Sequence, residues 1–222
     1  MGKIVLATII ISGSAKWLLN VDGNKEKWYG SDRIFMYVMT VFGAMTVNYS
    51  EQCTEYGWVV SNLRLLAGCL LAGGLLSAAY MDRRNCWVYN YVWWWCLPWA
   101  GILGMTAGGE FSGIVAVLVF VMLQQLLFSR MYGKADCHAF SVCALAECGN
   151  AVGMVGFLLQ MFLSVVLLTI VQLFRGNVTP RGRLREPQPF IPYIITAFFS
   201  VMFLESVFRT TYTVSYTHLT LP

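Results

Sequence analysis

The chain has 222 residues, of which 58% are hydrophobic and only 12% are charged. Soluble domains average about 45–50% apolar and about 25% charged residues, so this composition excludes an ordinary soluble domain and indicates a membrane protein. The net charge of +4 is small and the basic residues are dispersed, which gives no indication of a nucleic-acid partner and leaves the lipid bilayer as the expected surroundings.

The apolar runs predict the elements of the fold. A helix needs about 20 mainly apolar residues to cross the hydrocarbon layer. The runs that approach this length are 4–19, 34–49, 58–80, 87–107, 112–128, 151–174 and 189–208. A shorter segment, 137–150, contains the charged residue Glu147 and is expected to re-enter the membrane or to cross it only in part. The sequence therefore predicts an all-α, polytopic membrane bundle of about six to eight transmembrane helices.

The first apolar run has two interpretations. Lys3 before it and the small residues of "SGSA" after it are typical of a signal peptide. The polar stretch that follows, 20–33, looks like a loop rather than the start of a secreted domain, so we expect a retained anchor. Residues 1–57 are then divergent N-terminal membrane segments with a polar loop, and 58–208 form the main membrane domain.

Residues 209–222 form a C-terminal tail. Its end, "VSYTHLTLP", resembles a terminal peptide that recurs on unrelated draft-genome proteins and looks like translated sequencing adapter. We expect the natural sequence to differ after Thr213, so His218 receives no functional weight. The alternative is a genuine polar tail, since short chain ends tolerate change.

Lysine and arginine favour cytoplasmic loops, so their distribution predicts the orientation. Alternating spans place most of them on one face, which also receives Asp82 and Asp136. The basic residues on that face are Lys25, Lys27, Arg33, Arg83, Arg84, Arg130, Lys134, Arg175, Arg181, Arg183 and Arg185. The other face keeps Lys3 and Arg209 together with the acids Glu51, Glu55 and Glu110. The sequence thus assigns both aspartates to the cytoplasmic face.

The seven cysteines form no CxxC pair. An odd, dispersed number within apolar sequence is typical of small core residues rather than of a disulfide framework or a zinc site. No metal and no cofactor is predicted.

Two charged stretches interrupt the apolar sequence, "YMDRRNCWVYN" at 80–90 and "RMYGKADCHAF" at 130–140. Ionisable residues at membrane depth are costly and suggest a function. Two carboxyl groups that share a proton can act as base and acid, the first activating water and the second protonating a peptide carbonyl oxygen. On spacing alone an alternative stays open, in which Asp82 and Asp136 solvate loops with Arg83, Arg84 and Lys134 as counter-ions.

No histidine-based nucleophile site competes with the two aspartates. The chain has only two histidines, His138 and His218, and the second lies in the tail. His138 could act as a base, but a single histidine two residues from an acid is more commonly a local hydrogen-bond partner.

The two charged stretches resemble motifs of the type IV prepilin peptidases. "DRRNCWVYN" (82–90) is similar to the first motif, in which an aspartate is followed at fixed spacing by an aliphatic residue, usually Pro, and then Asn or Asp. Val88, Tyr89 and Asn90 occupy those places, so Tyr89 stands where Pro is usual.

The second motif, Gly-x-Gly-Asp followed by an apolar segment and often a Lys, resembles "GKADCHAF" (133–140). Gly133 and Asp136 match it, Ala135 stands in place of the second Gly, and His138 stands where the Lys often stands. Ala135 fits only if the backbone there avoids positive φ, which Gly adopts cheaply. We expect an active protein because Ala is the smallest replacement for Gly.

A third stretch, "PFIPYI" (189–194) with Pro189 and Pro192, is similar to the Pro-Phe-x-Pro-Phe signature that opens the last helix of the family. The resemblance covers about residues 58–208 and implies a membrane aspartic endopeptidase with Asp82 and Asp136 as the catalytic pair. It further implies a bacterial plasma-membrane location, and prepilin or pseudopilin precursors as partners, cut at the cytoplasmic face. The CxxC motifs of the long family members are absent from this sequence, so methyltransferase activity is not predicted.

Two other functions stay open. One is a small transporter or channel in which Asp82, Asp136 and Arg64 line an ion pathway, although the carboxylates lie at one end of the spans and no internal repeat is visible. The other is an inactive relative that binds pilin precursors without cutting them, which the change at Ala135 keeps open. The oligomeric state does not follow from the sequence.

Overall fold

A computed structural model describes residues 2–21, 30–52, 57–107, 111–130, 133–148, 153–175 and 188–219. Within these ranges the chain is all-helical, as predicted, with eight α-helices and one short 3-10 helix. The elements are α1 (Gly2–Asn20), α2 (Gly30–Gln52), α3 (Trp58–Asn85), α4 (Asn90–Thr106), α5 (Phe111–Leu126), η1 (Phe128–Arg130), α6 (Lys134–Glu147), α7 (Gly153–Phe174) and α8 (Ile191–Leu219).

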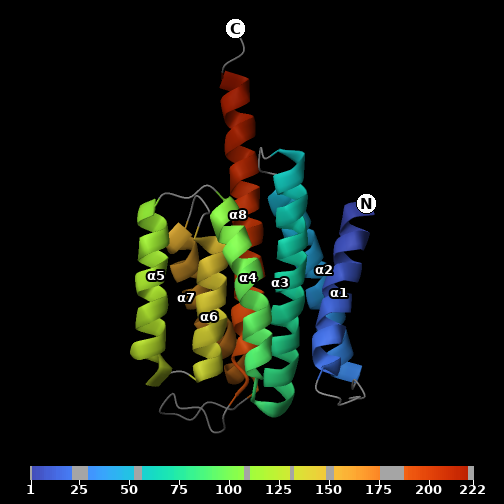
Figure 1. The fold of residues 1–222 in the computed structure, drawn as a ribbon, viewed down its shortest axis with the longest axis vertical. Coiled ribbons are helices and arrows are strands. Elements are labelled where there is room, and N and C mark those ends of the chain that lie inside the picture. Colours follow the sequence, from blue (N-terminus) through green and yellow to red (C-terminus); the bar gives the residue numbers. More distant parts are fainter. Residues whose placement is uncertain are drawn as a thin grey trace.

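Successive helices run in opposite directions and form a single bundle (Figure 1). The ends of α1, α3, α5 and α7 therefore lie at the same end of the bundle as the starts of α2, α4, α6 and α8. We call this the lower end, as it is drawn in Figure 1. α3 packs against α1, α2, α4 and α8, while α6 packs against α4, α5, α7 and α8. The first motif lies at the end of α3, the second at the start of α6 and the third at the start of α8. Because α8 contacts both α3 and α6, the three motifs lie close together.

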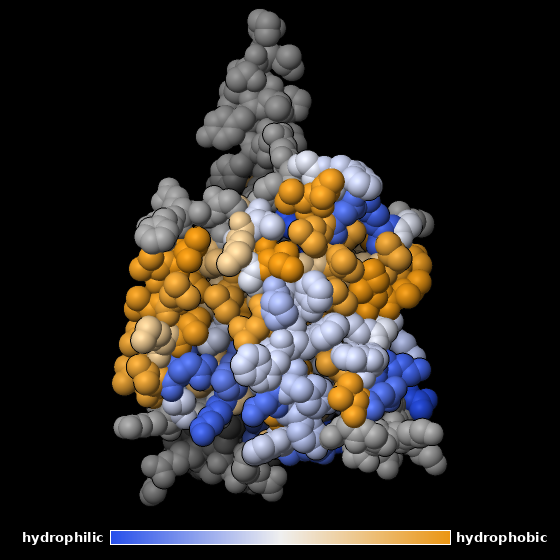
Figure 2. Space-filling model, viewed as in Figure 1, coloured by the Kyte–Doolittle hydropathy of each residue, from blue (hydrophilic) through white to orange (hydrophobic). Residues whose placement is uncertain are grey.

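In the part of the chain that the structure describes, four helices are long and apolar enough to cross a membrane, over Gly2–Asn20, Trp58–Asn85, Met154–Phe174 and Ile191–Phe208. A shorter apolar helix covers Gly113–Leu126. Large apolar side chains on the outside of the bundle are exposed, among them Ile9 of α1 and Met122 of α5. Figure 2 shows hydrophobic surface over α5 and over the upper part of the α1 and α3 side, with hydrophilic residues gathered toward the lower end. This surface suits a lipid environment, where such side chains need not be buried.

Small residues set the close packing of the central helices. A Cβ at Gly73 of α3 would meet the Ser14 side chain and the Ile11 carbonyl of α1. A Cβ at Gly104 of α4 would meet the Leu145 carbonyl of α6 and the Cys148 sulfur that follows it. Glycine at these places lets the helix backbones approach each other, as is common between membrane helices.

The helices begin and end differently from the apolar runs. α3 continues past the predicted run 58–80 to Asn85, so Asp82 lies in its last turn. α6 begins at Lys134, three residues before the predicted segment 137–150, so Asp136 lies in its first turn. Asp136 suits the first turn of α6, because the unpaired N–H groups and the partial positive charge of a helix start favour a negative side chain. At the end of α3 the partial charge is negative and suits Arg83 and Arg84. Asp82 in that turn is instead stabilised from outside its own helix. The loop interpretation of the two aspartates is therefore wrong.

The predicted partial span is an interior helix. α6 has 14 residues, and its last residue, Glu147, is only 3% exposed. Neither Glu147 carboxyl oxygen has a hydrogen-bond partner among the described residues. The segment is thus shorter than a membrane span and is covered by its neighbours rather than by lipid.

Candidate active site

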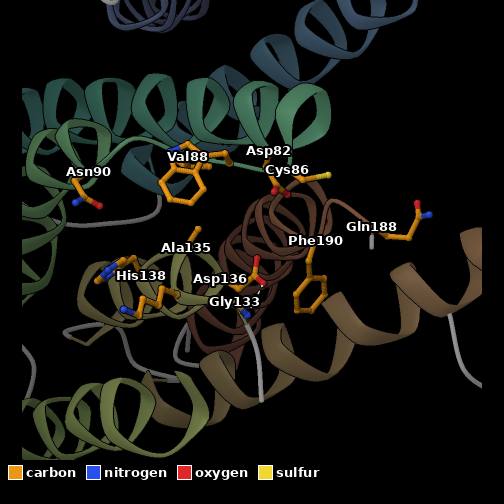
Figure 3. Close-up of a pocket in the computed structure, with 12 residues that line it drawn as sticks. Asp82, Cys86, Val88, Asn90, Gly133, Ala135, Asp136, His138, Gln188 and Phe190 are labelled. Atoms are coloured by element: carbon orange, nitrogen blue, oxygen red, sulfur yellow. Dashed lines mark hydrogen bonds between the residues drawn. The ribbon is translucent and has the colours of Figure 1, made fainter. Parts of the chain in front are cut away.

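The lower end of the bundle contains a pocket of ≈ 620 Å³ between the end of α3, the starts of α4 and α6, and the segment that leads into α8 (Figure 3). Its volume lies within the range of about 300–1,000 Å³ that is typical of ligand pockets. The lining residues are Asp82, Cys86, Trp87, Val88, Asn90, Gly133, Lys134, Ala135, Asp136, His138, Gln188 and Phe190. All of the predicted site residues except Pro189 and Pro192 therefore line one cavity.

Asp82 is 7% exposed and is held by the start of the last helix. Its Oδ2 atom accepts a hydrogen bond of 3.0 Å from the backbone N–H of Ile191, the first residue of α8. The first N–H groups of a helix have no partner within the helix and favour negative charge nearby. This contact stabilises Asp82 as a carboxylate, although the residue is almost completely buried.

The chain turns sharply just after Asp82. Cys86 ends α3 in the left-handed conformation, with φ of 50°, and its N–H donates to the Asp82 carbonyl oxygen at 2.9 Å. Cys86 is the only non-glycine residue with positive φ in the described part of the chain. The turn directs Trp87 and Val88 along the pocket wall before α4 begins at Asn90.

Asp136 lies on the opposite wall, in the first turn of α6. Its Oδ2 atom accepts a hydrogen bond of 3.2 Å from the N–H of Gly133, the residue before the helix. Burial, and in second place the charge of Asp82, raises the pKa of Asp136 to about 7, and the Gly133 N–H offsets this in part. In Figure 3 the carboxyl groups of Asp82 and Asp136 point toward one another across the pocket. Two such carboxyl groups can hold one proton and one negative charge between them.

Arg83 is not the counter-ion of the aspartates. Its Nε atom pairs with Asp32 Oδ1 of α2 at 3.0 Å, and its guanidinium lies over the Phe35 ring at 5.0 Å from the ring centre. Arg84 donates to the Tyr80 hydroxyl at 3.2 Å. The alternative in which Arg83 is a counter-ion of the aspartates is therefore wrong for this residue, because Arg83 ties the end of α3 to α2. Of the predicted counter-ions, Lys134 lines the pocket.

The motif residue Ala135 has an ordinary helical setting. It is the second residue of α6 and its φ is not positive. Gly133 has φ of −63° and ψ of 149°, which other residues also adopt, but a Cβ there would lie 3.1 Å from Asp136 Oδ2. The backbone conflict that would favour an inactive protein is thus absent at Ala135. Gly133 is the position at which a side chain would crowd the carboxyl group.

Pro189 and Pro192 flank the residues that approach Asp82. Pro189 lies between the pocket residues Gln188 and Phe190, and Pro192 follows Ile191 in the first turn of α8. Proline is tolerated in a first turn because its missing N–H would have no partner in the helix. The two prolines stiffen the segment whose Ile191 N–H holds Asp82.

Arg64 does not share the site. It lies on α3 with Asp82, 18 positions earlier, which corresponds to about 27 Å along a helix that rises about 1.5 Å per residue. Its guanidinium is buried and donates to the Leu103 carbonyl and the Thr106 hydroxyl of α4. The predicted ion pathway through Asp82, Asp136 and Arg64 therefore lacks one of its three members at the pocket.

Sequence reasoning missed several residues of the site. Phe190 stood inside the third motif without an assigned role, and Gln188 precedes that motif. Cys86 is exposed and lines the pocket, so its interpretation as a core cysteine is wrong. Buried Cys69, Cys96, Cys137 and Cys143 do match that interpretation. The Ile191 amide has no sequence signal at all, since every residue except proline carries an N–H.

Among the described residues, no three His, Cys, Asp or Glu side chains come together as metal ligands. The pocket's own chemistry is that of paired carboxyl groups in a partly apolar cavity, which can activate a water molecule and protonate an acceptor oxygen. No family model, curated protein or solved structure matches the chain.

Proposed function

We propose that the protein is a membrane-embedded aspartic endopeptidase that cleaves prepilin-like or pseudopilin precursors, as the resemblance of its motifs to type IV prepilin peptidases implies. The observation that carries the proposal is the meeting of Asp82 and Asp136 in one pocket, from two separate helices. A single buried carboxylate could be structural, but two that face a shared cavity form an acid and base pair.

The charge of Asp82 supports a division of roles between the two aspartates. Each accepts a backbone N–H, but burial and the charge of Asp82 raise the pKa of Asp136 and so favour the proton on Asp136, which leaves Asp82 as the general base. Asp136 has a pKa of about 7 and so still carries a proton in a substantial fraction of molecules at neutral pH, which suits it to act as the general acid.

The reaction then follows from these roles. Asp82 takes a proton from water as the water oxygen attacks the peptide carbonyl carbon, while Asp136 protonates the carbonyl oxygen. The tetrahedral intermediate collapses when the C–N bond breaks and the departing nitrogen receives the proton from Asp82. The carbonyl oxygen returns its proton to Asp136, and both carboxyl groups recover their starting states.

The location of the pocket is consistent with cleavage at the cytoplasmic membrane surface. The described basic residues Arg33, Arg83, Arg84, Lys134 and Arg175 lie at or next to helix ends at the lower end of the bundle (Figure 1). Basic residues favour the cytoplasmic side. A substrate whose apolar segment lies in the membrane would therefore present its leader junction at the level of the pocket.

The proposal is tested by co-expression with a prepilin-like protein from the same genome, with precursor and product followed by mass spectrometry. Asp82→Asn and Asp136→Asn should each lower the cleavage rate by about 10²–10⁴-fold. Asp32→Asn is the matched control, because Asp32 lies at the same end of the bundle, pairs with Arg83 and does not line the pocket. Cleavage that survives either pocket substitution would exclude the two-aspartate mechanism.

A further inference from the structure

A relay of hydrogen-bond contacts behind the pocket leads to His138. The side-chain nitrogen of Gln125 in α5 lies 3.3 Å from His138 Nδ1 and 3.3 Å from the Ser141 hydroxyl. Ser141, in the middle of α6, donates its own proton to the Cys137 carbonyl at 2.8 Å. Gln125 and Ser141 do not line the pocket, whereas His138 does.

The proton positions in this relay follow from counting donors. A serine hydroxyl has one proton, and that of Ser141 is used on Cys137, so its oxygen can only accept from Gln125. With the Ser141 proton on Cys137, Gln125 turns its NH₂ group toward Ser141, because its carbonyl oxygen there would face another acceptor. The same NH₂ group faces His138 Nδ1, which must then be the unprotonated ring nitrogen. The proton of a neutral His138 is consequently on Nε2.

The surroundings of His138 keep the ring neutral and fixed. Burial lowers its pKa, and the nearby charge of Lys134 lowers it further. The Trp93 ring lies at 6.0 Å between ring centres, with an interplanar angle of 39°. In the described part of the chain, Nε2 has no hydrogen-bond partner. The ring thus offers one unused N–H donor.

His138 and Asn90 lie at one end of the pocket, and the two carboxyl groups lie toward its middle (Figure 3). Asn90 is exposed at the start of α4 and carries both a donor and an acceptor in its amide. A peptide group also has one donor and one acceptor, which a carboxamide and an imidazole N–H can match. The chemistry of this end therefore fits an extended peptide backbone.

We propose that His138, with its proton on Nε2, and Asn90 anchor the backbone of the substrate away from the cleaved bond, His138 donating to a peptide carbonyl. This inference rests on the proposed peptidase function. Gln125 and Ser141 are positioning residues, since they act only through His138. The anchor binds substrate before and during the reaction alike, so its loss raises KM and leaves kcat unchanged.

The proton position is measured without substrate by nuclear magnetic resonance of protein that carries ¹⁵N-labelled histidine. The chain has two histidines, so the spectrum of His138→Phe assigns the signals. Wild type should show the Nε2-protonated form of His138, and Gln125→Leu should show a mixture of both neutral forms. Gln124→Leu is the matched control, because Gln124 faces Met161 of α7 instead of His138 and should leave the His138 signals unchanged. An Nδ1-protonated form or a mixture in wild type overturns the relay.

The anchor is tested by cleavage kinetics and by binding. His138→Phe should raise KM by up to about tenfold, which is the loss of affinity expected when one neutral hydrogen bond is removed. The kcat of this variant should stay within about twofold of the wild-type value. His138→Gln should restore most of the affinity, because its amide nitrogen can replace Nε2 as the donor. A synthetic peptide that spans a prepilin-like cleavage site, added to Asp136→Asn, should shift the His138 Nε2–H signal.

Each outcome bears on one proposal. An unchanged KM in His138→Phe, or a loss in kcat alone, overturns the anchor even where the proton lies on Nε2. Cleavage that persists in Asp82→Asn or Asp136→Asn contradicts the proposed function instead, while the histidine spectrum and the peptide titration still decide whether the relay and the binding end exist.

Discussion

Asp136 differs from most aspartates because the folded protein retains its proton up to neutral pH. The pKa rises from 3.8 to about 7, chiefly through burial and also through the charge of Asp82. A raised carboxyl pKa means that the folded state binds a proton that the unfolded chain releases. The ionisation of Asp136 therefore opposes folding.

The pH dependence of stability follows from this residue. Between pH 3.8 and about 7 the folded state binds more protons at Asp136 than the unfolded state, so the free energy of unfolding falls as the pH rises. Asp136→Asn removes this contribution, so the variant should gain stability relative to wild type as the pH rises from about 4 to about 8. Thermal unfolding of detergent-solubilised protein measures the difference at each pH.

The control for this measurement is Asp32→Asn, whose carboxylate is ion-paired with Arg83 away from the pocket. It should show no such gain over this range. Equal pH profiles for wild type and Asp136→Asn would mean that Asp136 is ionised at neutral pH, and would remove the basis for its role as the acid.

Single residues show what sequence could and could not predict of the site. Asp82 and Asp136 were predictable as partners because each interrupts apolar sequence at the same predicted face. The contact between Asp82 and Ile191 was not, because a backbone N–H has no side-chain signature and the two residues are far apart in the chain. The pairing of Arg83 with Asp32 was not predictable either. Arg83 follows Asp82 directly in the sequence, but in the folded helix its side chain points to α2 and pairs with Asp32.

At the scale of the helices, the crossing of α4 and α6 depends on one glycine. Gly104→Ala would push a methyl group into the Leu145 carbonyl and the Cys148 sulfur. The backbone carbonyl cannot move aside cheaply, so we expect a loss of stability of about 1–3 kcal/mol, as for other overpacked interiors. Thermal unfolding and expression level measure it.

The same helix supplies the matched comparison for this prediction. Gly101 lies one turn earlier on α4, and a Cβ there meets nothing within 4 Å. Gly101→Ala should be neutral or stabilising by up to about 1 kcal/mol, because Ala favours helix more than Gly does. Equal effects of Gly101→Ala and Gly104→Ala on stability would mean that the close approach of α4 to α6 does not require glycine at position 104.

Helix existence was easier to predict than helix ends. Apolar runs located α3, α4 and α7 because a span must be apolar over most of its length. The ends were missed at Asp82 and Asp136, since charged residues stop an apolar run while helix termini accept them. Asp82 and Asp136 lie in the last turn of α3 and the first turn of α6. These turns were mispredicted because the helices extend beyond the apolar runs.

At the scale of the whole molecule, the alternation of the helices places both aspartates at one end, and the basic residues predict that this end faces the cytoplasm. Cys86 is exposed at this end. In intact cells a membrane-impermeant maleimide should fail to label Cys86, and it should label Cys86 in permeabilised cells. Peptide mass spectrometry in a Cys53→Ser background reads the label.

A cysteine at the opposite end controls for reagent access. Gly57 is exposed at the start of α3, with open space around its Cβ position. Gly57→Cys in a Cys53→Ser, Cys86→Ser background should be labelled in intact cells. Labelling of Cys86 from outside intact cells would invert the orientation and place the pocket on the wrong side for the proposed substrates.

The contact between Asp82 and Ile191 also sets an order of events during protein synthesis. A ribosome that has made α3 and α6 has already produced both aspartates, but the amide that holds Asp82 arrives only with α8. Until that helix enters the bundle, the nascent chain has both aspartates but not the hydrogen bond that Asp82 accepts from Ile191. Under the proposed function, the two aspartates are therefore synthesised before the contact that completes their pocket.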